Sequence, residues 1–282
     1  MAILIGLLVG NMGGPIQAKI NSIQPSDQQF KIYIPLVSNG SSMVLVPSGT
    51  FQMGCDPLHN GGNVCYPEVL PLHTVYLDAY QIDKTEVTNA AYAGCVAAGI
   101  CAAPWSNSSK TRSSYYGNLA YANYPVLYVN WNQAQAYCAW DGKRLPSEAE
   151  WEKAARGPTI QAYPWGDASP TCTLANFWGD YGAWSVCEGD TSQVGSHPTG
   201  ASYYGAQDMA GNAWEWVNDW YDASYYSGSP LSNPTGPITG TDKVLRGGSW
   251  DDYPTYLRVS TRFRGSPANI SNYIGFRCAA NP

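Results

Sequence analysis

The stretch Lys143–Gly157 reads KRLPSEAEWEKAARG, and it carries the clearest helix signal in the chain. Ser147 is followed three residues later by Glu150, which is the spacing of a capping box. Gly157 is the residue type that most often ends a helix. We therefore predict a helix over Glu148–Arg156.

Elsewhere the sequence indicates little regular structure. Two further helices are indicated, with candidate caps at Thr88 or Asn89 for residues 90–98, and at Asn130 or Asn132 for a segment ending at Trp140. Beyond Gly157 no helical period is present. The expected strands are a hairpin within MVLVPSGTFQMG, which begins at Met43, and short strands at Lys243–Arg246 and Ile274–Ala279.

The composition excludes several classes of protein. Of the 282 residues only 13% are charged, whereas 13% are aromatic, and the chain contains 29 Gly and 20 Pro. This balance argues against a coiled coil, a helical bundle and a disordered chain. The formal net charge of -6 gives no basic surface for nucleic acid or anionic lipid. We expect a core covered largely by loops.

The N-terminal region reads as an export segment. Residues 1–18 begin with the apolar run MAILIGLLVG, which has the length of a signal-peptide core and is too short to span a bilayer, although no basic segment precedes it. Residues 19–42 read as a linker with one short strand at Lys31–Val37. The domain proper is predicted over residues 43–282. We thus expect a secreted or cell-surface protein with no membrane span in its mature form.

The eight cysteines fit an oxidising compartment. The pairs that lie close in the sequence are Cys55 with Cys65, Cys95 with Cys101, and Cys172 with Cys187. Cys138 and Cys278 remain, and a bridge between them would close a loop of about 140 residues. A zinc site is the alternative, but no CxxC occurs, and the chain has only three histidines: His59, His73 and His197.

Three further stretches are distinctive in combination with Lys143–Gly157: DMAGNAWEWVNDW at Asp208–Trp220, VLRGGSW at Val244–Trp250 and IGFRCA at Ile274–Ala279. Together they resemble the formylglycine-generating enzyme family, also called the sulfatase-modifying-factor domain, from Met43 to the C-terminus. The resemblance implies an α+β domain of the C-type-lectin-like kind with low regular secondary structure. It also implies the bridge between Cys138 and Cys278.

The oxidase activity of that family depends on two cysteines, five residues apart, that bind copper just after the GGS motif. The positions that match here are Asp252 and Leu257, and no cysteine lies between Cys187 and Cys278. A thiolate is the nucleophile and the soft copper ligand that such chemistry requires. The resemblance therefore predicts a protein without this activity and without copper. A diverged oxidoreductase or an accessory factor of the family is the alternative.

The resemblance also implies calcium. The first implied site comprises Asn176, the carbonyl of Phe177, Asp190 and the carbonyl of Ser192, and the second comprises Asp208, the carbonyls of Gly211 and Ala213, and Glu215. The residues of the second site argue for it independently, because small residues let a loop turn its carbonyls inward while two acids contribute charge. The alternative is that both acids only hydrogen-bond the loop.

The C-terminal tract has the composition of a recognition surface. The tryptophans near it read mainly as core, because large rings replace missing regular structure. Between framework residues the tract carries Tyr, Ser, Asp, Gly and Thr, as antibody paratopes do. The candidate ligand-binding residues are Trp250, Asp251, Asp252, Tyr253, Thr255, Tyr256, Ser260, Phe263, Gly265, Ser266, Ile270, Ser271 and Tyr273.

Variable proteins of diversity-generating retroelements are similar: a scaffold of this kind ends in a segment from GGSW to GFR whose codons are randomised at adenines. Each tract residue after Trp250 in that set can be reached from an AAY codon by changing adenines alone. The sequence thus predicts a non-catalytic binding protein with an unidentified protein or glycan ligand and no nucleic-acid partner. The remaining alternative is a structural extracellular domain.

Overall fold

The computed structural model describes residues 42–179 and 186–282. Within these ranges the α-helices are α1 (Asn89–Ala97), α2 (Trp131–Trp140) and α3 (Glu148–Arg156). The strands are β1 (Met43–Val46), β2 (Gly49–Met53), β3 (His73–Leu77), β4 (Tyr80–Asp83), β5 (Trp214–Trp220), β6 (Lys243–Arg246), β7 (Phe263–Gly265), β8 (Ile274–Phe276) and β9 (Ala279–Ala280). The predicted signal peptide, the strand at Lys31–Val37 and all but the last residue of the predicted linker lie outside the described residues.

The capping signals locate the helices correctly. At α3, the Ser147 hydroxyl accepts from the Glu150 amide at 3.2 Å, and the Glu150 carboxylate accepts from the Ser147 amide at 2.8 Å. Gly157 ends α3 with a φ of 76°. Of the alternative caps, Thr88 begins α1 and Asn130 begins α2. These bonds are local, which is why the sequence sufficed to predict them.

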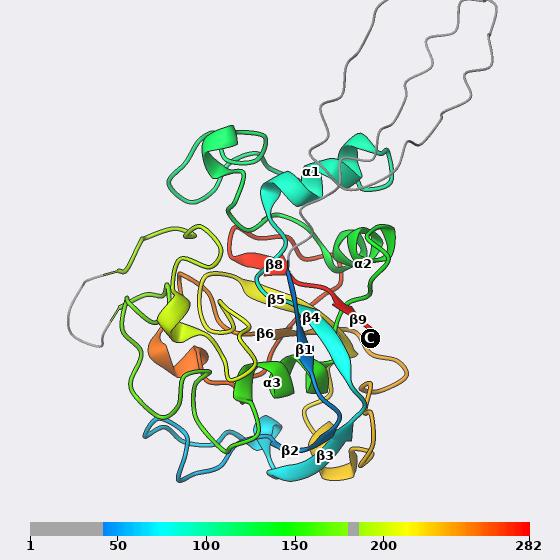
Figure 1. Ribbon diagram of the computed structural model, residues 1–282, viewed down its shortest axis with the longest axis vertical. Helices are drawn as coiled ribbons and strands as arrows, with labels where there is room; N and C mark the ends of the chain where they lie inside the picture. The colour runs from blue at the N-terminus through cyan, green and yellow to red at the C-terminus, as the bar shows by residue number, and fades with distance from the viewer. Residues whose placement is uncertain (1–41, 180–185) are drawn as a thin grey trace, which may run out of the picture. The chain divides into compact units, whose positions relative to one another are not determined.

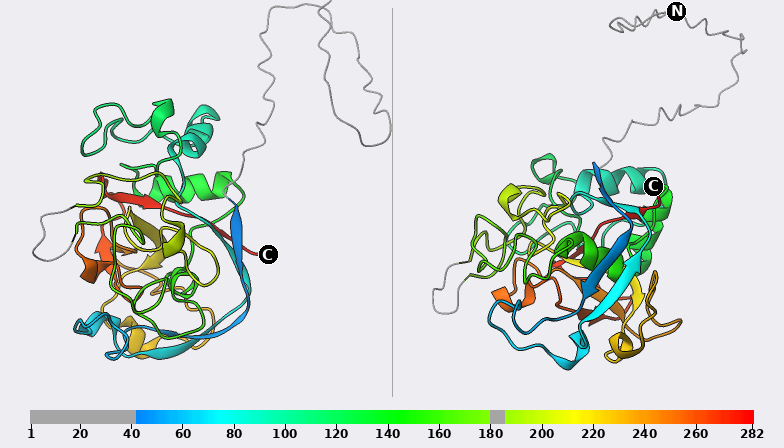
Figure 2. Two further views of the ribbon diagram at one scale, coloured as in Figure 1. Left: turned by 60° about the vertical axis from the view of Figure 1, so that its left-hand side comes forward. Right: turned by 60° about the horizontal axis from the view of Figure 1, so that its bottom comes forward.

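The predicted hairpin is wrong. β1 pairs with β4 and β2 pairs with β3, both antiparallel, so the two segments belong to different sheets. The turn between them is held to α3, because the Lys153 ammonium donates to the carbonyls of Pro47 and Gly49 at 2.8 and 2.9 Å. These two hydrogen bonds hold the turn against α3, where β1 and β2 diverge into different sheets. Figure 2 shows β1 running alongside β4.

A four-stranded sheet in the order β7-β6-β5-β8 forms the centre of the domain. β5 is antiparallel to β6 and parallel to β8. The sequence did not indicate β5, because both of its faces are buried and the apolar alternation is lost. The predicted strand Ile274–Ala279 is divided into β8 and β9, which lie in different sheets, since Arg277 and Cys278 between them are engaged elsewhere.

Helices cover both faces of this sheet. α3 packs between the central sheet and the β2–β3 pair, whereas α1 and α2 lie on the opposite face (Figure 1). Trp151, Trp214, Trp216 and Trp250 are among the largest fully buried side chains. The predicted structural role of the last three is confirmed. Large rings fill the core of a domain that has little regular structure.

All four predicted disulfides are present: Cys55–Cys65, Cys95–Cys101, Cys138–Cys278 and Cys172–Cys187. Cys138–Cys278 joins α2 to the segment between β8 and β9 and closes a loop of sequence separation 140. In residues 42–179 and 186–282, no helix is long and apolar enough to cross a membrane.

Candidate ligand-binding site

A cavity of about 620 Å³ lies where the C-terminal tract meets the loop closed by Cys55–Cys65. From the tract, Tyr253, Thr255, Tyr256 and Phe263 contribute to its wall. The rings of Tyr253, Tyr256 and Phe263 are 43%, 41% and 44% exposed. The opposite wall consists of residues 62–64, Tyr66, Glu68 and Val69.

The exposed rings rest on the core of the domain. Trp214 in β5 stacks under Phe263 with ring centres 5.2 Å apart, and Tyr256 approaches the same indole edge-on at 6.5 Å. Gly248 allows the short helical turn Pro254–Tyr256 to pack closely, because a Cβ there would lie 3.1 Å from the Tyr256 carbonyl. Its φ of 74° also favours glycine. The cavity wall is therefore supported by a rigid strand.

The other predicted ligand-binding residues are divided between surface and core. Trp250, Ser260 and Gly265 are buried and do not reach the surface, in contrast to the sequence prediction. Trp250 donates from its indole to the Asn272 carbonyl at 3.1 Å and so belongs to the scaffold. The remaining candidates are exposed or half-buried but do not line the cavity: Asp251, Asp252, Ser266, Ile270, Ser271 and Tyr273.

The positions that match the catalytic cysteines carry no thiol chemistry. Asp252 accepts from the amide of Ser249 at 3.0 Å and from its hydroxyl, and burial raises the pKa of this carboxyl group. Leu257 is completely buried. All eight cysteines of the chain are in disulfides. No thiolate is thus present to bind copper or attack a substrate.

The second implied calcium site lies beside a buried ion pair. Glu215 in β5 receives Arg277 through two bonds of 2.7 Å, and the Trp151 indole donates to it at 2.8 Å. Asp208 accepts from the Gly195 amide at 2.6 Å. Gly211 approaches Asn176 so closely that a Cβ would lie 2.2 Å from the Asn176 carbonyl oxygen.

Sequence reasoning missed Glu86, which belongs to the same cluster. Its Oε1 accepts from the Asn212 amide group at 2.8 Å, whereas its Oε2 is buried and receives no N–H donor among the described residues. The carboxyl groups of Glu86 and Asp208 are hydrogen-bonded to each other. Burial, followed by the charge of Asp208, raises the pKa of Glu86 well above its ordinary value. Burial also raises the pKa of Asp208 and of Glu215. Three carboxyl groups thus face one guanidinium, that of Arg277.

The first implied calcium site already contains a cation. The Arg112 guanidinium lies 3.3 Å from Asp190 and 4.9 Å from the ring centres of both Tyr121 and Tyr124. Burial opposes ionisation of Asp190, but hydrogen bonds from Ser109 and Thr111 lower its pKa overall. The Phe177 carbonyl accepts from the Cys187 amide at 3.2 Å, and the Ser192 amide donates to Asn212 at 2.9 Å.

Asn176 has one buried amide oxygen without a partner in the described part of the chain. Across residues 42–179 and 186–282, no three His, Cys, Asp or Glu side chains are arranged to hold a metal ion among themselves. Any cation at either implied site would therefore depend on backbone carbonyls as well.

The central mixed sheet, the covering helices and the exposed aromatic tract define an α+β domain of the C-type-lectin-like, formylglycine-generating-enzyme-like class. The family described as sulfatase-modifying factor enzyme 1-like domain matches residues 35–282, and the chain belongs to this family.

Relatives within this family differ in their names. The formylglycine-generating enzyme of Streptomyces coelicolor is 37% identical over 84% of this chain and 88% of its own length. The solved structure of Treponema denticola variable protein 1 superposes with a TM-score of 0.67 at 27% identity, covering 85% of this chain and 95% of that one. PvdO from Pseudomonas aeruginosa gives a TM-score of 0.69 at 28% identity, covering 85% and 94%. The function of this chain must therefore be argued from its own site.

Proposed function

We propose that this chain is a non-catalytic ligand-binding protein, secreted or displayed at the cell surface, whose binding surface is built on the C-terminal tract. The observation that carries the proposal is the cavity walled by Tyr253, Tyr256 and Phe263. The rings of Tyr256 and Phe263 lie against Trp214 of the buried strand β5, and rigid aromatic side chains lose little entropy when they bind a ligand. The ligand is a protein or a glycan.

Two further observations support this proposal. No thiol is available at Asp252 or Leu257 for the chemistry of formylglycine formation. Four disulfides fit an oxidising, extracellular environment. The same proposal includes diversification by a retroelement. Residues of the tract that line the cavity are among the residue types that adenine changes in an AAY codon can produce. Treponema denticola variable protein 1 also has a similar fold.

Binding is tested with arrays of glycans and of peptides. We expect selective binding that weakens at least about tenfold in the variant Tyr256→Ala/Phe263→Ala, since each buried aromatic contact contributes on the order of 1 kcal/mol or more. Tyr203→Ala is the matched control, because Tyr203 is 71% exposed and does not line the cavity. Equal losses in both variants would exclude the cavity as the binding site.

A catalytic role is tested separately. A cysteine-containing peptide is incubated with the protein, copper and oxygen, and mass spectrometry follows formation of the aldehyde. Turnover would overturn the non-catalytic proposal and favour a diverged oxidoreductase. Diversification is tested in the genome: a nearby near-copy of the DNA encoding Trp250–Tyr273, differing only at adenines, is required, together with a reverse transcriptase gene.

We include calcium at the second implied site. Glu215 is fully used by Arg277 and Trp151, so the cation would be held by Asp208, Glu86 and the carbonyls of Gly211 and Ala213. Three carboxyl groups against one guanidinium leave this site short of positive charge, and the Glu86 oxygen that receives no N–H donor is a hard ligand of the type calcium prefers. At the first site Arg112 supplies that charge, so we do not extend the proposal to it.

Chelation should lower the melting temperature, because an ion bound only to the native state stabilises it by mass action. The variant Glu86→Gln/Asp208→Asn should melt at the same temperature with and without chelator. Asp190→Asn serves as the comparison at the first site and should keep the calcium response. An unchanged melting curve of the unaltered protein in chelator would refute the calcium proposal.

A further inference from the structure

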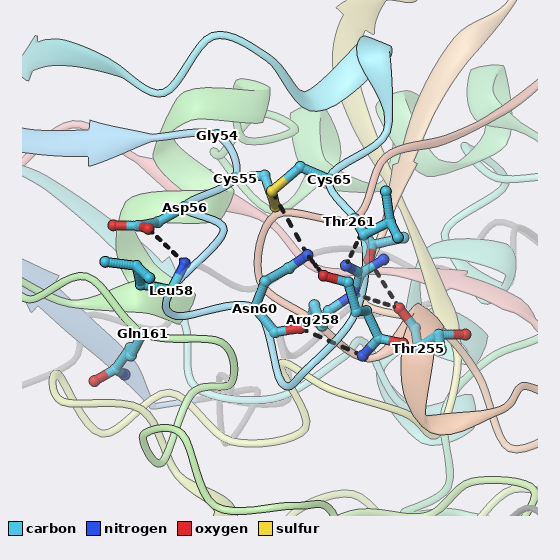
Figure 3. Close-up of a disulfide and its surroundings, with 12 residues drawn as sticks. Gly54, Cys55, Asp56, Leu58, Asn60, Cys65, Gln161, Thr255, Arg258 and Thr261 are labelled. Atoms are coloured by element: carbon cyan, nitrogen blue, oxygen red, sulfur yellow. Dashed lines mark hydrogen bonds between the residues drawn. A yellow bond between two sulfur atoms is a disulfide. The ribbon is translucent and has the colours of Figure 1, made fainter.

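Arg258 is a buried arginine without a carboxylate partner. Its side chain lies at the cavity, and only 3% of the residue is exposed. Nε donates to the Thr255 carbonyl at 2.7 Å and Nη1 donates to the Val64 carbonyl at 3.3 Å. Figure 3 shows Arg258 between the Cys55–Cys65 loop and the segment that carries Thr255 and Thr261.

The other buried arginines of the described chain each contact at least one carboxylate. Arg156 pairs with Glu152 at 2.9 Å, and Arg262 and Arg277 pair with Glu148 and Glu215 at 2.7 Å. Arg246 also contacts Glu152. Arg258 has no Asp or Glu within 4.0 Å among the described residues, so its buried charge carries an uncompensated desolvation cost.

The free edge of this guanidinium is open to the cavity. Nη2 donates to no acceptor in residues 42–179 and 186–282. It is accessible to solvent, because it does not belong to the fully buried side-chain atoms that lack a hydrogen-bond partner. Burial lowers the pKa of Arg258, which reflects the missing counter-charge. Arginine nevertheless stays ionised in proteins, so the cavity presents a charged donor.

The charges around Arg258 do not cancel it. Two other charged residues line the cavity, Arg262 and Glu68. Arg262 is held by Glu148 through bonds of 2.7 and 3.0 Å. Glu68 is half-buried, and no ion pair joins its carboxylate to Arg258 within 4.0 Å. The cavity thus combines one unpaired, buried positive charge with exposed Tyr and Phe rings.

We propose that Arg258 binds a carboxylate carried on a ring-bearing group of the ligand, such as an aromatic acid or a uronic acid. This inference rests on the proposed ligand-binding function. A guanidinium donates to carboxylate oxygens through charge-assisted bonds, while the rings of Tyr256 and Phe263 offer stacking surface beside it. Arg258 lies between diversifiable tract positions, and it supplies the same charge whichever side chains form the wall.

The probes are benzoate with benzamide as its neutral counterpart, and glucuronate with methyl glucoside. Affinities are measured by NMR titration of the whole chain. Each acid should bind at least about tenfold more tightly than its neutral counterpart, which corresponds to about 1.4 kcal/mol, and added salt should reduce this preference. The two pairs distinguish an aromatic acid from an acidic sugar as the better source of the carboxylate.

In Arg258→Gln the preference for the acid should vanish while benzamide binding is retained. Arg258→Lys should keep part of the preference, since it keeps the charge but not the planar donor edge. Arg264→Gln is the matched control, because Arg264 is an exposed arginine in β7 with a 59% exposed side chain, and it should bind like the unaltered protein.

The outcomes separate this inference from the proposed function. Equal affinity for acid and neutral probes in the unaltered protein would overturn the role of Arg258, and no variant is needed for that result. The same holds if no probe shifts the resonances of the cavity residues. The proposed binding function would still stand if the arrays showed selective binding that Tyr256→Ala/Phe263→Ala weakens.

Discussion

Arg277 is the residue on which the buried charge balance of the core most depends. It donates to both oxygens of Glu215 and to the carbonyls of Asp83, Lys84 and Gln207. Arg277→Met would leave Glu215 as an uncompensated buried charge, so we expect the free energy of unfolding to fall by about 3 to 5 kcal/mol. Urea unfolding measures this change.

Arg264 provides the matched control for that experiment. Its 3.8 Å pair with Asp242 is exposed, so Arg264→Met should change stability by less than about 0.5 kcal/mol. The double variant Arg277→Met/Glu215→Gln should recover part of the loss, because it removes both members of the pair. A loss for Arg277→Met no larger than that for Arg264→Met would show that the pair contributes little.

Asp219 is buried and gives the domain a specific pH dependence. Burial, followed by the charge of Glu148, raises the pKa of this carboxyl group from 3.8 to about 8. The native state therefore binds more protons than the unfolded state between these values, and stability falls as the pH rises through this window. Asp219→Asn should make this decline shallower between pH 5 and pH 7, while the other buried carboxyl groups with a raised pKa keep their share: Glu86, Asp208 and Glu215. Lys243, whose pKa is lowered to about 8, loses its proton above this range.

Asparagine keeps an acceptor for the Glu148 amide, which donates to Asp219 at 2.9 Å. The variant should consequently fold, and its unfolding free energy should be compared with that of the unaltered protein at both pH values. Parallel pH profiles for the two proteins would contradict a raised pKa at Asp219.

At the scale of elements, the N-terminus of α3 is joined to β5 of the central sheet, because the Glu148 amide donates to Asp219 at 2.9 Å. Ser147 accepts from Glu150, and Glu150 also receives Arg144 at 2.6 and 2.7 Å. Ser147→Ala should lower the free energy of unfolding by about 1 kcal/mol, because one helical amide loses its acceptor. Ser147→Thr keeps the hydroxyl and should lose less; the reverse order in thermal unfolding would argue against the cap.

At the scale of the whole molecule, Cys138–Cys278 links the middle of the chain to its end. Replacing both cysteines by Ala releases a loop of 140 residues, whereas the same change at Cys95–Cys101 releases a loop of 6. Because the entropy of the unfolded chain grows with loop length, we expect the first pair to cost about 3 kcal/mol more than the second. All four sulfurs are buried, so the two variants leave comparable cavities.

Chemical unfolding of both double variants measures that difference. Equal losses would mean that the long bridge acts through local packing rather than through the unfolded chain, as happens when the reduced chain keeps residual structure.

The sequence predicted the features that depend on neighbours in the chain. The caps at Ser147 and Gly157 and the close cysteine pairs follow from short spacings. The prediction failed for the hairpin at Met43, because strand pairing depends on segments far away in the sequence. In the tract, a polar or small residue type could not reveal that Ser260 and Gly265 are buried.

By itself, the sequence determined the family through its linked motifs, the positions of the helix ends, and the absence of a thiol at Asp252 and Leu257. Tertiary structure alone decided which charges are neutralised. Glu215 meets Arg277, and Glu86 meets Asp208, across separations of about sixty and more than a hundred residues, while Arg258 receives no acid from the part of the chain that the structure describes. The reason is physical: a cap is a local hydrogen bond, whereas the partner of a buried charge is chosen by the packing of distant segments.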